Sequence, residues 1–189
     1  MEFEVHVTVK SKNIEQFKED CSSINVKPIV INMENVNEQQ VMTSSKHRSD
    51  NYIVICDSIK NQLISKGYNI ERIKVEKNPS EVKDNEHIYF ESHLRVSFDD
   101  KEQNKILLSQ ILKKHNVHLS RNMFKKHKDK CFYMCTLRNK NTNITSFRNQ
   151  IEKVKNEISL NKLFEIDKIE VEECIFDSNE SLDNNWLNN

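Results

Sequence analysis

Glycine is nearly absent from this chain of 189 residues, which has one glycine, Gly67, and two prolines. The phosphate-binding loops of common nucleotide-binding folds need several closely spaced glycines, because the backbone must approach the phosphates. No segment of this sequence has such spacing. The composition therefore excludes P-loop and dinucleotide-binding enzymes of the usual type.

An excess of either charge is also lacking, because Lys plus Arg and Asp plus Glu number 29 each. A strongly basic chain would favour nucleic acid or an anionic membrane surface, and this balance favours neither. No apolar run approaches the ~20 residues that a membrane-spanning helix needs. The first residues form a charged, alternating pattern without a signal peptide, and the five cysteines fit reduced thiols. We therefore expect a cytoplasmic protein.

Hydrophobic periodicity predicts the same order of elements in both halves of the chain. Residues 2–10 alternate strictly between apolar and polar, which predicts a strand with one buried face. The remaining predictions for the first half are a helix at 13–24, strands at 29–33 and 39–45, a helix from an N-cap at Asp50 to Gly67, and a strand at 70–77. For the second half they are a strand at 88–98, a helix at 105–115, strands at 117–121 and 131–137, a helix at 144–163, and a strand at 166–176. The order βαββαβ is typical of ferredoxin-like folds.

Two short segments recur in both halves. Residues 3–9 read FEVHVTV and residues 90–96 read FESHLRV, while IKVE at 73–76 is matched by IEVE at 169–172. We therefore predict an α+β protein of tandem duplicated ferredoxin-like units, packed into one pseudo-twofold globule. The predicted boundaries are a first unit at 1–77, a linker at 78–87, a second unit at 88–176 and a C-terminal tail at 177–189.

The alternation places equivalent polar residues on the face of each predicted sheet that no helix covers. In the ferredoxin-like strand order, Glu4 and His6 lie beside the fourth strand of the first half, and Glu91 and His93 beside that of the second. Imidazole and carboxylate groups suit Zn²⁺, Fe²⁺ or Mn²⁺. If the two open faces meet, we expect a small-ligand or divalent-metal site at the seam between the units, with catalysis left open. The predicted metal ligands are His6, His93, Glu4 and Glu91, and the predicted ligand-binding residues around them are Lys74, Glu76, Arg95 and Glu172.

Other interpretations of these residues stay open. The simplest is that both histidines are partly exposed strand residues paired with glutamates across the sheet. A phosphate-handling enzyme is another, because Glu2 and Glu4 resemble the ExExK strand of the triphosphate-tunnel enzymes, a resemblance that implies binding of phosphate and Mg²⁺. His6 stands where that family has lysine.

The two-histidine phosphoesterases offer a second comparison, because residues 6–8 (HVT) and 118–120 (HLS) resemble their paired HxT/S motifs. The duplication, however, pairs His6 with His93, and Arg95 stands where that second motif would need a hydroxyl. A non-catalytic RNA or protein interaction module is the remaining class, suggested by the basic segment KKHKDK at 125–130. RNA-binding sheets of this fold present aromatic side chains on the open face, whereas Phe3 and Phe90 are expected to face the helices.

Three segments, YFESH at 89–93, HLSRN at 118–122 and DSNESLDNNW at 177–186, resemble small uncharacterised bacterial proteins. This resemblance implies no activity and no site residues. Cys131 and Cys135 have the spacing CxxxC, but on a strand they would lie ~13 Å apart, too far to bind one metal ion. We expect both to be buried as small apolar side chains.

Overall fold

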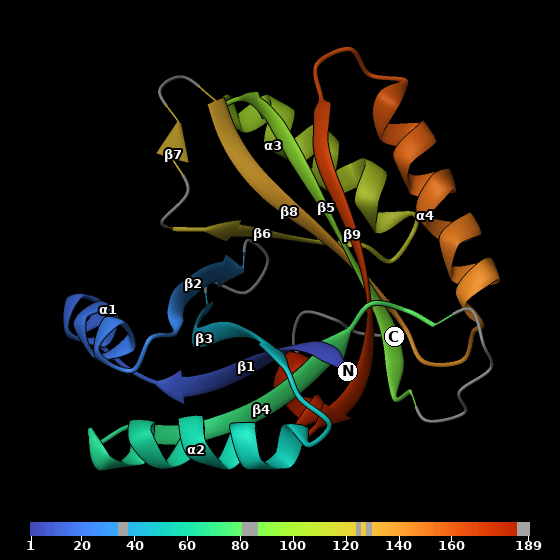
Figure 1. The fold of residues 1–189 in the computed structure, drawn as a ribbon. Helices are drawn as coiled ribbons and strands as arrows, with labels where there is room; N and C mark the ends of the chain where they lie inside the picture. Colours follow the sequence, from blue (N-terminus) through green and yellow to red (C-terminus); the bar gives the residue numbers. More distant parts are fainter. Residues whose placement is uncertain (34–37, 81–86, 124–125, 128–129, 185–189) are drawn as a thin grey trace.

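The computed structural model describes residues 1–33, 38–80, 87–123, 126–127 and 130–184, and its fold is shown in Figure 1. The first half contains β1 (Glu2–Lys10), α1 (Ile14–Ser23), β2 (Lys27–Met33), β3 (Glu38–Arg48), α2 (Tyr52–Ser65) and β4 (Asn69–Lys77). The second half contains β5 (Tyr89–Asp99), α3 (Glu102–Lys113), β6 (His118–Asn122), β7 (Lys126–His127), β8 (Lys130–Asn139), α4 (Ile144–Ser159) and β9 (Glu165–Asp177). A short 3₁₀ helix, η1 (Glu180–Asp183), follows.

The strand order confirms a ferredoxin-like arrangement in each half. The first half has the order β4-β1-β3-β2 and the second has β9-β5-β8-β6, with all neighbours antiparallel. The fourth strands of the two halves pair with each other, as do the second strands. Every strand except the two-residue β7 therefore belongs to one closed antiparallel barrel of eight strands.

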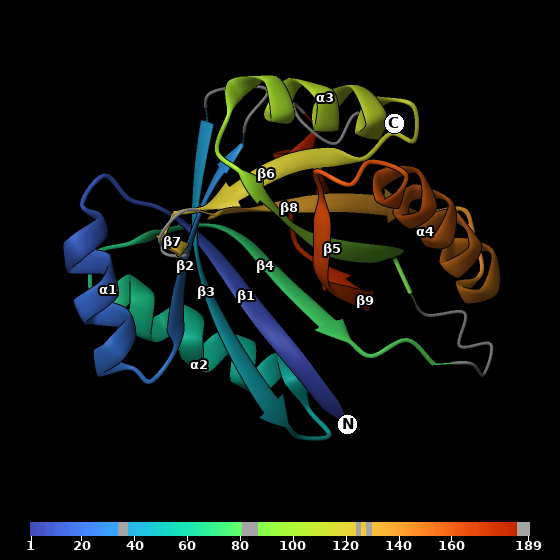
Figure 2. The same ribbon diagram turned by 90° about the horizontal axis from the view of Figure 1, so that it is seen from above.

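Edge pairing replaces the face-to-face packing that we predicted for the two units. Unpaired edge strands carry free backbone N–H and C=O groups, and the β4–β9 and β2–β6 pairs satisfy them. The helices α1 and α2 cover the outside of the first half, and α3 and α4 cover the second (Figures 1 and 2). As a result, the open faces of both sheets line the inside of the barrel.

Two hydrophobic cores lie between the sheet and the helices, one in each half. In the first, Phe3 and Val7 on β1 pack with Phe17 on α1 and Leu63 on α2. The second core has an equivalent composition and includes Phe90, Leu94, Leu108, Leu112, Phe147 and Ile151. Because side chains alternate along a strand, burying Phe3 and Val7 outward directs their polar neighbours into the barrel.

Local chemistry sets the helix ends and corrects two predictions. The N-cap of α2 is Asn51 rather than Asp50, because the Asn51 side chain accepts hydrogen bonds from the backbone N–H groups of residues 53 and 54. Gly67, at φ 88°, ends this helix as predicted. Helix α4 ends at Ser159, four residues before the predicted end, because its buried stripe stops at Ile158 and Leu160 is 82% exposed.

Some predictions concern residues outside the described ranges. The expected linker at 78–87 includes residues 81–86, and the basic segment at 125–130 includes 125, 128 and 129, none of which the structure describes. The predicted domain boundaries therefore stay predictions. Within the described ranges, no helix is long and apolar enough to span a bilayer. Cys135 is buried, as expected for a small apolar side chain, whereas the side chain of Cys131 lies outside the described part of the structure.

Candidate functional site

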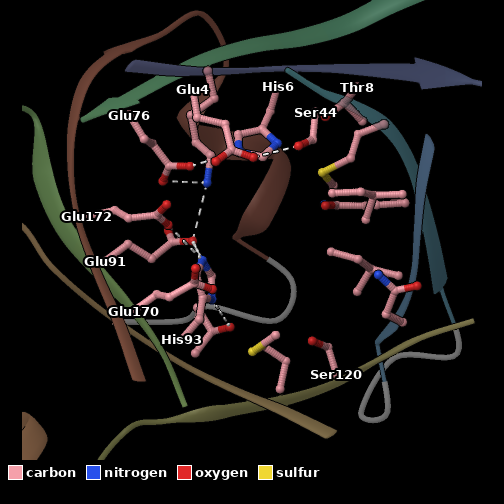
Figure 3. A pocket seen from close by; sticks show the side chains of 18 of the residues that line it. Glu4, His6, Thr8, Ser44, Glu76, Glu91, His93, Ser120, Glu170 and Glu172 are labelled. Carbon is pink, nitrogen blue, oxygen red and sulfur yellow. Dashed lines mark hydrogen bonds and ion pairs between the residues drawn. The ribbon is translucent and has the colours of Figure 1, made fainter. Parts of the chain in front are cut away.

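The barrel encloses a cavity of about 310 Å³ (Figure 3). Its lining differs between two sides. The charged wall consists of inward residues of β1, β4, β5 and β9, namely Glu4, His6, Lys74, Glu76, Glu91, His93, Glu170 and Glu172. The apolar wall consists of Ile29 and Ile31 on β2, Met42 on β3 and Met134 on β8. The cavity thus offers charged and apolar contacts on different strands.

His6 lies at the centre of the first constellation in the charged wall. In the strand register it is opposite Lys74 on β4 and Ser44 on β3. Its Nε2 atom is 3.6 Å from Glu4 Oε1 and 3.2 Å from Glu76 Oε2. Ser44 Oγ donates a hydrogen bond of 2.5 Å to Glu4, and Lys74 Nζ lies 2.8 Å from Glu76 Oε1.

His93 also lies between two glutamates in the second half. Its Nε2 atom is 3.1 Å from Glu91 Oε1 and 3.5 Å from Glu172 Oε2. Its Nδ1 atom is 3.1 Å from Thr136 Oγ1 on β8, the strand position that corresponds to Ser44 in the first half. Each histidine therefore lies between one glutamate of its own strand and one of the fourth strand of its half.

Buried ion pairs connect the two constellations. Lys74 Nζ donates a hydrogen bond of 3.3 Å to Glu91 Oε1 and so joins the halves. Arg138 on β8 donates to Glu91 at 2.8 Å and to Asp183 at 2.7 Å. Asp183 belongs to η1 and also accepts from Arg72 at 2.6 Å. The C-terminal segment is therefore held to both halves through one carboxylate that is 2% exposed.

The electrostatic environment separates the glutamates into two groups. Burial raises the pKa of Glu76, but Lys74 and His6 outweigh it and lower the pKa to about 2. Against the same burial effect, Arg138 and Lys74 hold the pKa of Glu91 well below its usual range. Glu172 differs, because burial and repulsion from Glu76 raise its pKa to about 7.

The pKa of His93 is raised to about 9 despite burial, because Glu91 accepts its hydrogen bond and both Glu91 and Glu172 attract its charge. His93 is therefore an imidazolium at neutral pH. His93 carries a proton at neutral pH, and the neighbouring Glu172 has a pKa of about 7. The cavity therefore contains two neighbouring groups that can exchange protons.

Glu76 is a buried carboxylate whose charge is balanced by Lys74 and His6 but whose hydrogen bonding is incomplete. Its side chain is 1% exposed, and neither carboxylate oxygen accepts a hydrogen bond from the described residues. The contacts with Lys74 and His6 bring opposite charges close but lack hydrogen-bond geometry. The Nδ1 atom of His6 is likewise buried without a hydrogen bond in this part of the chain. A buried polar group in this state is expected to have a partner in its working form.

The structure brings seven of the eight predicted site residues into one space. They are His6, His93, Glu4, Glu91, Lys74, Glu76 and Glu172. Arg95, which we predicted as ligand-binding, does not line the cavity. It lies two residues beyond His93 on β5, where its side chain is 3.9 Å from Asp167 and 5.6 Å from the ring of Phe132.

Metal binding stays a prediction. Among the residues that the structure describes, no three His, Cys, Asp or Glu side chains are arranged to hold one metal ion. The Nε2 atoms of His6 and His93 each face their own pair of carboxylates, so the two histidines do not converge on the same carboxylates. A zinc site needs ligands converging at about 2 Å on one point.

The residues of the phosphate-handling and RNA interpretations lie elsewhere. Glu2 is 62% exposed and pairs with Arg48, and neither Glu2 nor His118 is among the residues that line the cavity. Phe3 and Phe90 are 2% and 4% exposed and belong to the two cores. The prediction that these aromatic rings face the helices is confirmed.

Three buried residues of the network were missed by sequence reasoning. Arg138 lies opposite Glu91 in the register, but the predicted strand ended at residue 137, one position short of it. Extending the alternation by one residue would have placed it in the cavity. Tyr89 is fully buried, and its hydroxyl donates to Asp177 at 2.6 Å. Asp183 has no sequence signal, because only the folding of the chain brings η1 to the barrel.

Comparison with known proteins assigns no family. No protein-family model and no curated protein matches the chain. Among solved structures, the acetolactate synthase small subunit from Thermotoga maritima is 12% identical, with a TM-score of 0.34 and coverage of 94% of this chain and 96% of that one. A mutant chlorite dismutase from Candidatus Nitrospira defluvii is 9% identical over 92% and 90% of the two chains, with a TM-score of 0.29. A siroheme decarboxylase is 6% identical over 93% and 72%, with a TM-score of 0.28. Likenesses at this level support no argument about ligand or activity.

Proposed function

We propose that this protein binds a small molecule inside its barrel, between the charged wall and the apolar wall. The observation that carries the proposal is Glu76, a carboxylate that is 1% exposed, faces the cavity and accepts no hydrogen bond within the described part of the chain. Leaving a buried acceptor unsatisfied costs about 1–3 kcal/mol, and more for a charged group. A ligand that donates to Glu76 would recover this free energy on binding.

The volume and composition of the cavity support the same conclusion. Small-molecule sites commonly have volumes of roughly 300–1,000 Å³, with an apolar lining and a few convergent polar groups. The cavity of about 310 Å³ lies at the lower end of this range. Such a volume fits a compact ligand rather than a polymer.

Phosphate binding is less well supported by the contacts. The cations of the interior are already neutralised: Arg72 contacts Asp177 and Asp183, and Lys74 contacts Glu76 and Glu91. A phosphate would have to displace carboxylates that are themselves buried, and each displaced carboxylate would lose its counter-charge. Binding of a ligand that carries no phosphate or other anionic group is therefore the better-supported function.

We also infer that the two units arose by internal duplication. The supporting observation is that Glu4 and His6 have equivalents in Glu91 and His93: each glutamate is opposite a glutamate of the fourth strand and a basic residue of the third, and each histidine is opposite a hydroxyl residue of the third. The linker at 78–87 would then be the junction of the two copies. Related sequences in which the halves are more alike would support this origin, and relatives that contain a single half would support it further.

A pair of matched tryptophan substitutions tests the proposed function. Ile31 lines the cavity, so Ile31→Trp places a larger ring in the space a ligand would occupy. Ile53 is 57% exposed on the outside of α2, so Ile53→Trp makes the same chemical change away from the barrel. A metabolite library is screened by thermal unfolding and ligand-observed NMR.

We expect compounds that bind the wild type and Ile53→Trp equally and bind Ile31→Trp at least about tenfold more weakly. Circular dichroism establishes that both variants are folded. Compounds that bind all three proteins alike would place the site elsewhere and contradict the proposal. Turnover of any bound compound then tests whether the site is catalytic.

A further inference from the structure

We propose that the ligand is an organic ammonium ion, whose charged nitrogen lies against Glu76 and Glu172 and whose apolar part lies against Ile31 and Met42. This inference rests on the proposed function and names the chemical class of the ligand. It follows from the hydrogen-bonding state of Glu76, the few cationic contacts of Glu172 and the composition of the opposite wall.

Among the described residues, the carboxylates and cations of the interior are close to balance, so the contacts of each carboxylate decide where the charge of a ligand would lie. The carboxylates are Glu4, Glu76, Glu91, Glu170, Glu172 and Asp183 in the cavity lining, with Asp177 bound to Arg72 behind it. The Lys and Arg side chains of the lining are Lys27, Lys46, Arg72, Lys74, Arg138 and Lys168, of which Lys27, Lys46 and Lys168 are exposed. The seven carboxylates therefore face six Lys or Arg side chains and the His93 imidazolium. Lys46 lies 3.6 Å from Glu4 and supplies its counter-charge.

Glu172 on β9 has few cationic contacts. Among the described residues it has one ion-pair contact, with His93 at 3.5 Å, whereas Glu91 contacts three cationic groups. Repulsion from Glu76 is one of the two effects that raise the pKa of Glu172, so the two carboxyl groups are close enough to interact strongly. Figure 3 shows Glu76 and Glu172 on the same side of the cavity. A positive charge between them would be attracted by both.

The state of Glu76 specifies a hydrogen-bond donor as well as a charge. Both of its oxygens lack a hydrogen bond from the described residues, although the side chain is 1% exposed. An ammonium group has three N–H donors and one positive charge, so it can donate to both carboxylates at once. Charge-assisted hydrogen bonds of this kind are about twice as strong as neutral ones.

A metal ion is a poorer fit than an ammonium ion. Lys74 Nζ lies 2.8 Å from Glu76 and 3.3 Å from Glu91, so a lysine already stands between two carboxylates that a metal would need. No metal-binding set of three side chains is present among the described residues. An ammonium ion accepts looser geometry, because its contacts are about 2.8 Å long rather than about 2 Å.

The apolar wall indicates that the ligand has a hydrocarbon part. Ile29, Ile31, Met42 and Met134 line the cavity from β2, β3 and β8, which complete the barrel on the side away from β4 and β9. A hydrated inorganic cation would leave these side chains facing water. An alkyl chain would remove apolar surface from water at roughly 25 cal/mol per Å². Methionine adapts its shape to such a chain.

The experiment uses three probes with the same four-carbon chain, n-butylammonium, butanol and butyrate, titrated into the full-length protein at pH 7.5. Binding is followed by isothermal titration calorimetry and by the imidazole NMR signals of His6 and His93. We expect n-butylammonium to shift these signals and to bind at least about tenfold more tightly than butanol, because a hydrogen bond to a charged group is worth about 1.5–3 kcal/mol. Butyrate should show no binding.

Two carboxylate variants and one control locate the site. Glu76→Gln and Glu172→Gln should each weaken n-butylammonium binding by about tenfold or more while leaving butanol binding within about twofold. Glu2→Gln makes the same change on β1, where Glu2 is 62% exposed and outside the cavity lining, and should leave both unchanged. If Glu76→Gln fails to fold, Glu172→Gln alone decides the result.

The outcomes separate this inference from the proposed function. Butanol or butyrate binding as tightly as n-butylammonium, with loss in Ile31→Trp, would keep the cavity as a ligand site but overturn its preference for ammonium. Displacement of n-butylammonium by equimolar Zn²⁺, with retention of the metal after dialysis, would overturn it in favour of a metal ion. No binding of n-butylammonium, or binding unaffected by both carboxylate variants, would also overturn it.

Discussion

Replacing Glu172 by glutamine should stabilise this protein above neutral pH and leave its stability unchanged in acid. In the folded protein, burial and repulsion from Glu76 raise the pKa of Glu172 from 4.5 to about 7. A carboxyl with a raised pKa binds its proton more tightly when folded, so the folded state loses stability as pH rises from 4.5 to about 7. Glutamine resembles the protonated form of glutamate in shape and carries no charge. The Glu172→Gln variant should therefore not lose stability over this pH range.

The expected size follows from the pKa difference. A change from 4.5 to about 7 corresponds to about 3 kcal/mol at 1.36 kcal/mol per unit. The side chain is 20% exposed, and contact with water reduces the effect, so we expect a gain of about 2 kcal/mol for Glu172→Gln at pH 8. Urea unfolding at pH values from 4 to 8.5, analysed by linear extrapolation, measures this difference directly.

The neighbours of Glu172 must be accounted for in this measurement. They are Glu91 and His93 on β5, Lys74 and Glu76 on β4, and His6 on β1. The substitution removes an anion beside the His93 imidazolium and should lower its pKa, which NMR titration of the ring protons measures. The raised pKa of His93, about 9, adds stability that is complete below pH 6.5 and lost as pH rises to about 9. That window lies mostly above the window of Glu172.

Glu170→Gln is the matched control, because Glu170 is on the same strand and the same face. Its pKa is lowered against the opposing effect of burial by the hydrogen bond from Lys168, and its side chain is 38% exposed. We therefore expect a change within about 0.5 kcal/mol at every pH. Glu172→Gln destabilising the protein at pH 8, or changing its stability equally at pH 4 and pH 8, would refute the reasoning.

Two further substitutions test the fold. Asp183→Asn removes a buried carboxylate that contacts both Arg72 and Arg138 and leaves each arginine with one buried counter-charge, so the free energy of unfolding should fall by about 2 kcal/mol in urea titrations. Glu180→Gln, in the same 3₁₀ helix but 36% exposed, should change it by less than about 1 kcal/mol. Equal effects of both would contradict a bridging role for Asp183. Asn51→Ala removes the cap of α2 and should cost about 1 kcal/mol, measured by thermal unfolding, whereas unchanged stability would show that α2 does not depend on this cap.

Elements with strong periodicity were predictable from the sequence. The strict alternation at residues 2–10 predicted β1, its buried face and the polar face that lies beside β4, and the structure places Glu4 opposite Glu76 and His6 opposite Lys74. The second half agrees in the same way, with Glu91 opposite Glu172. A side-chain period of two excludes a shift of either strand by one residue, which would bury its charges in the hydrophobic core, whereas the choice among shifts of two residues depends on tertiary contacts.

The helix ends were less predictable, because they depend on contacts of single residues. Asp50 and Asn51 are both good N-cap residues, and the sequence could not choose between them. In the structure, Asn51 accepts from two backbone N–H groups, while Asp50 lies 3.4 Å from the N-terminal amine. At the end of α4, the helical pattern continued through Leu163, but that side chain has no core to pack against and is 55% exposed.

The sequence by itself determined the two βαββαβ units, the buried and open face of each sheet, and the polar residues on the open faces. These properties depend on periodicity within single elements, and periodicity is local. Only the tertiary structure decided that the units join by their edges into one barrel, and that Arg138 and Asp183 enter it. Pairing of β4 with β9, and insertion of Asp183, joins residues about a hundred positions apart, and no local pattern encodes those contacts.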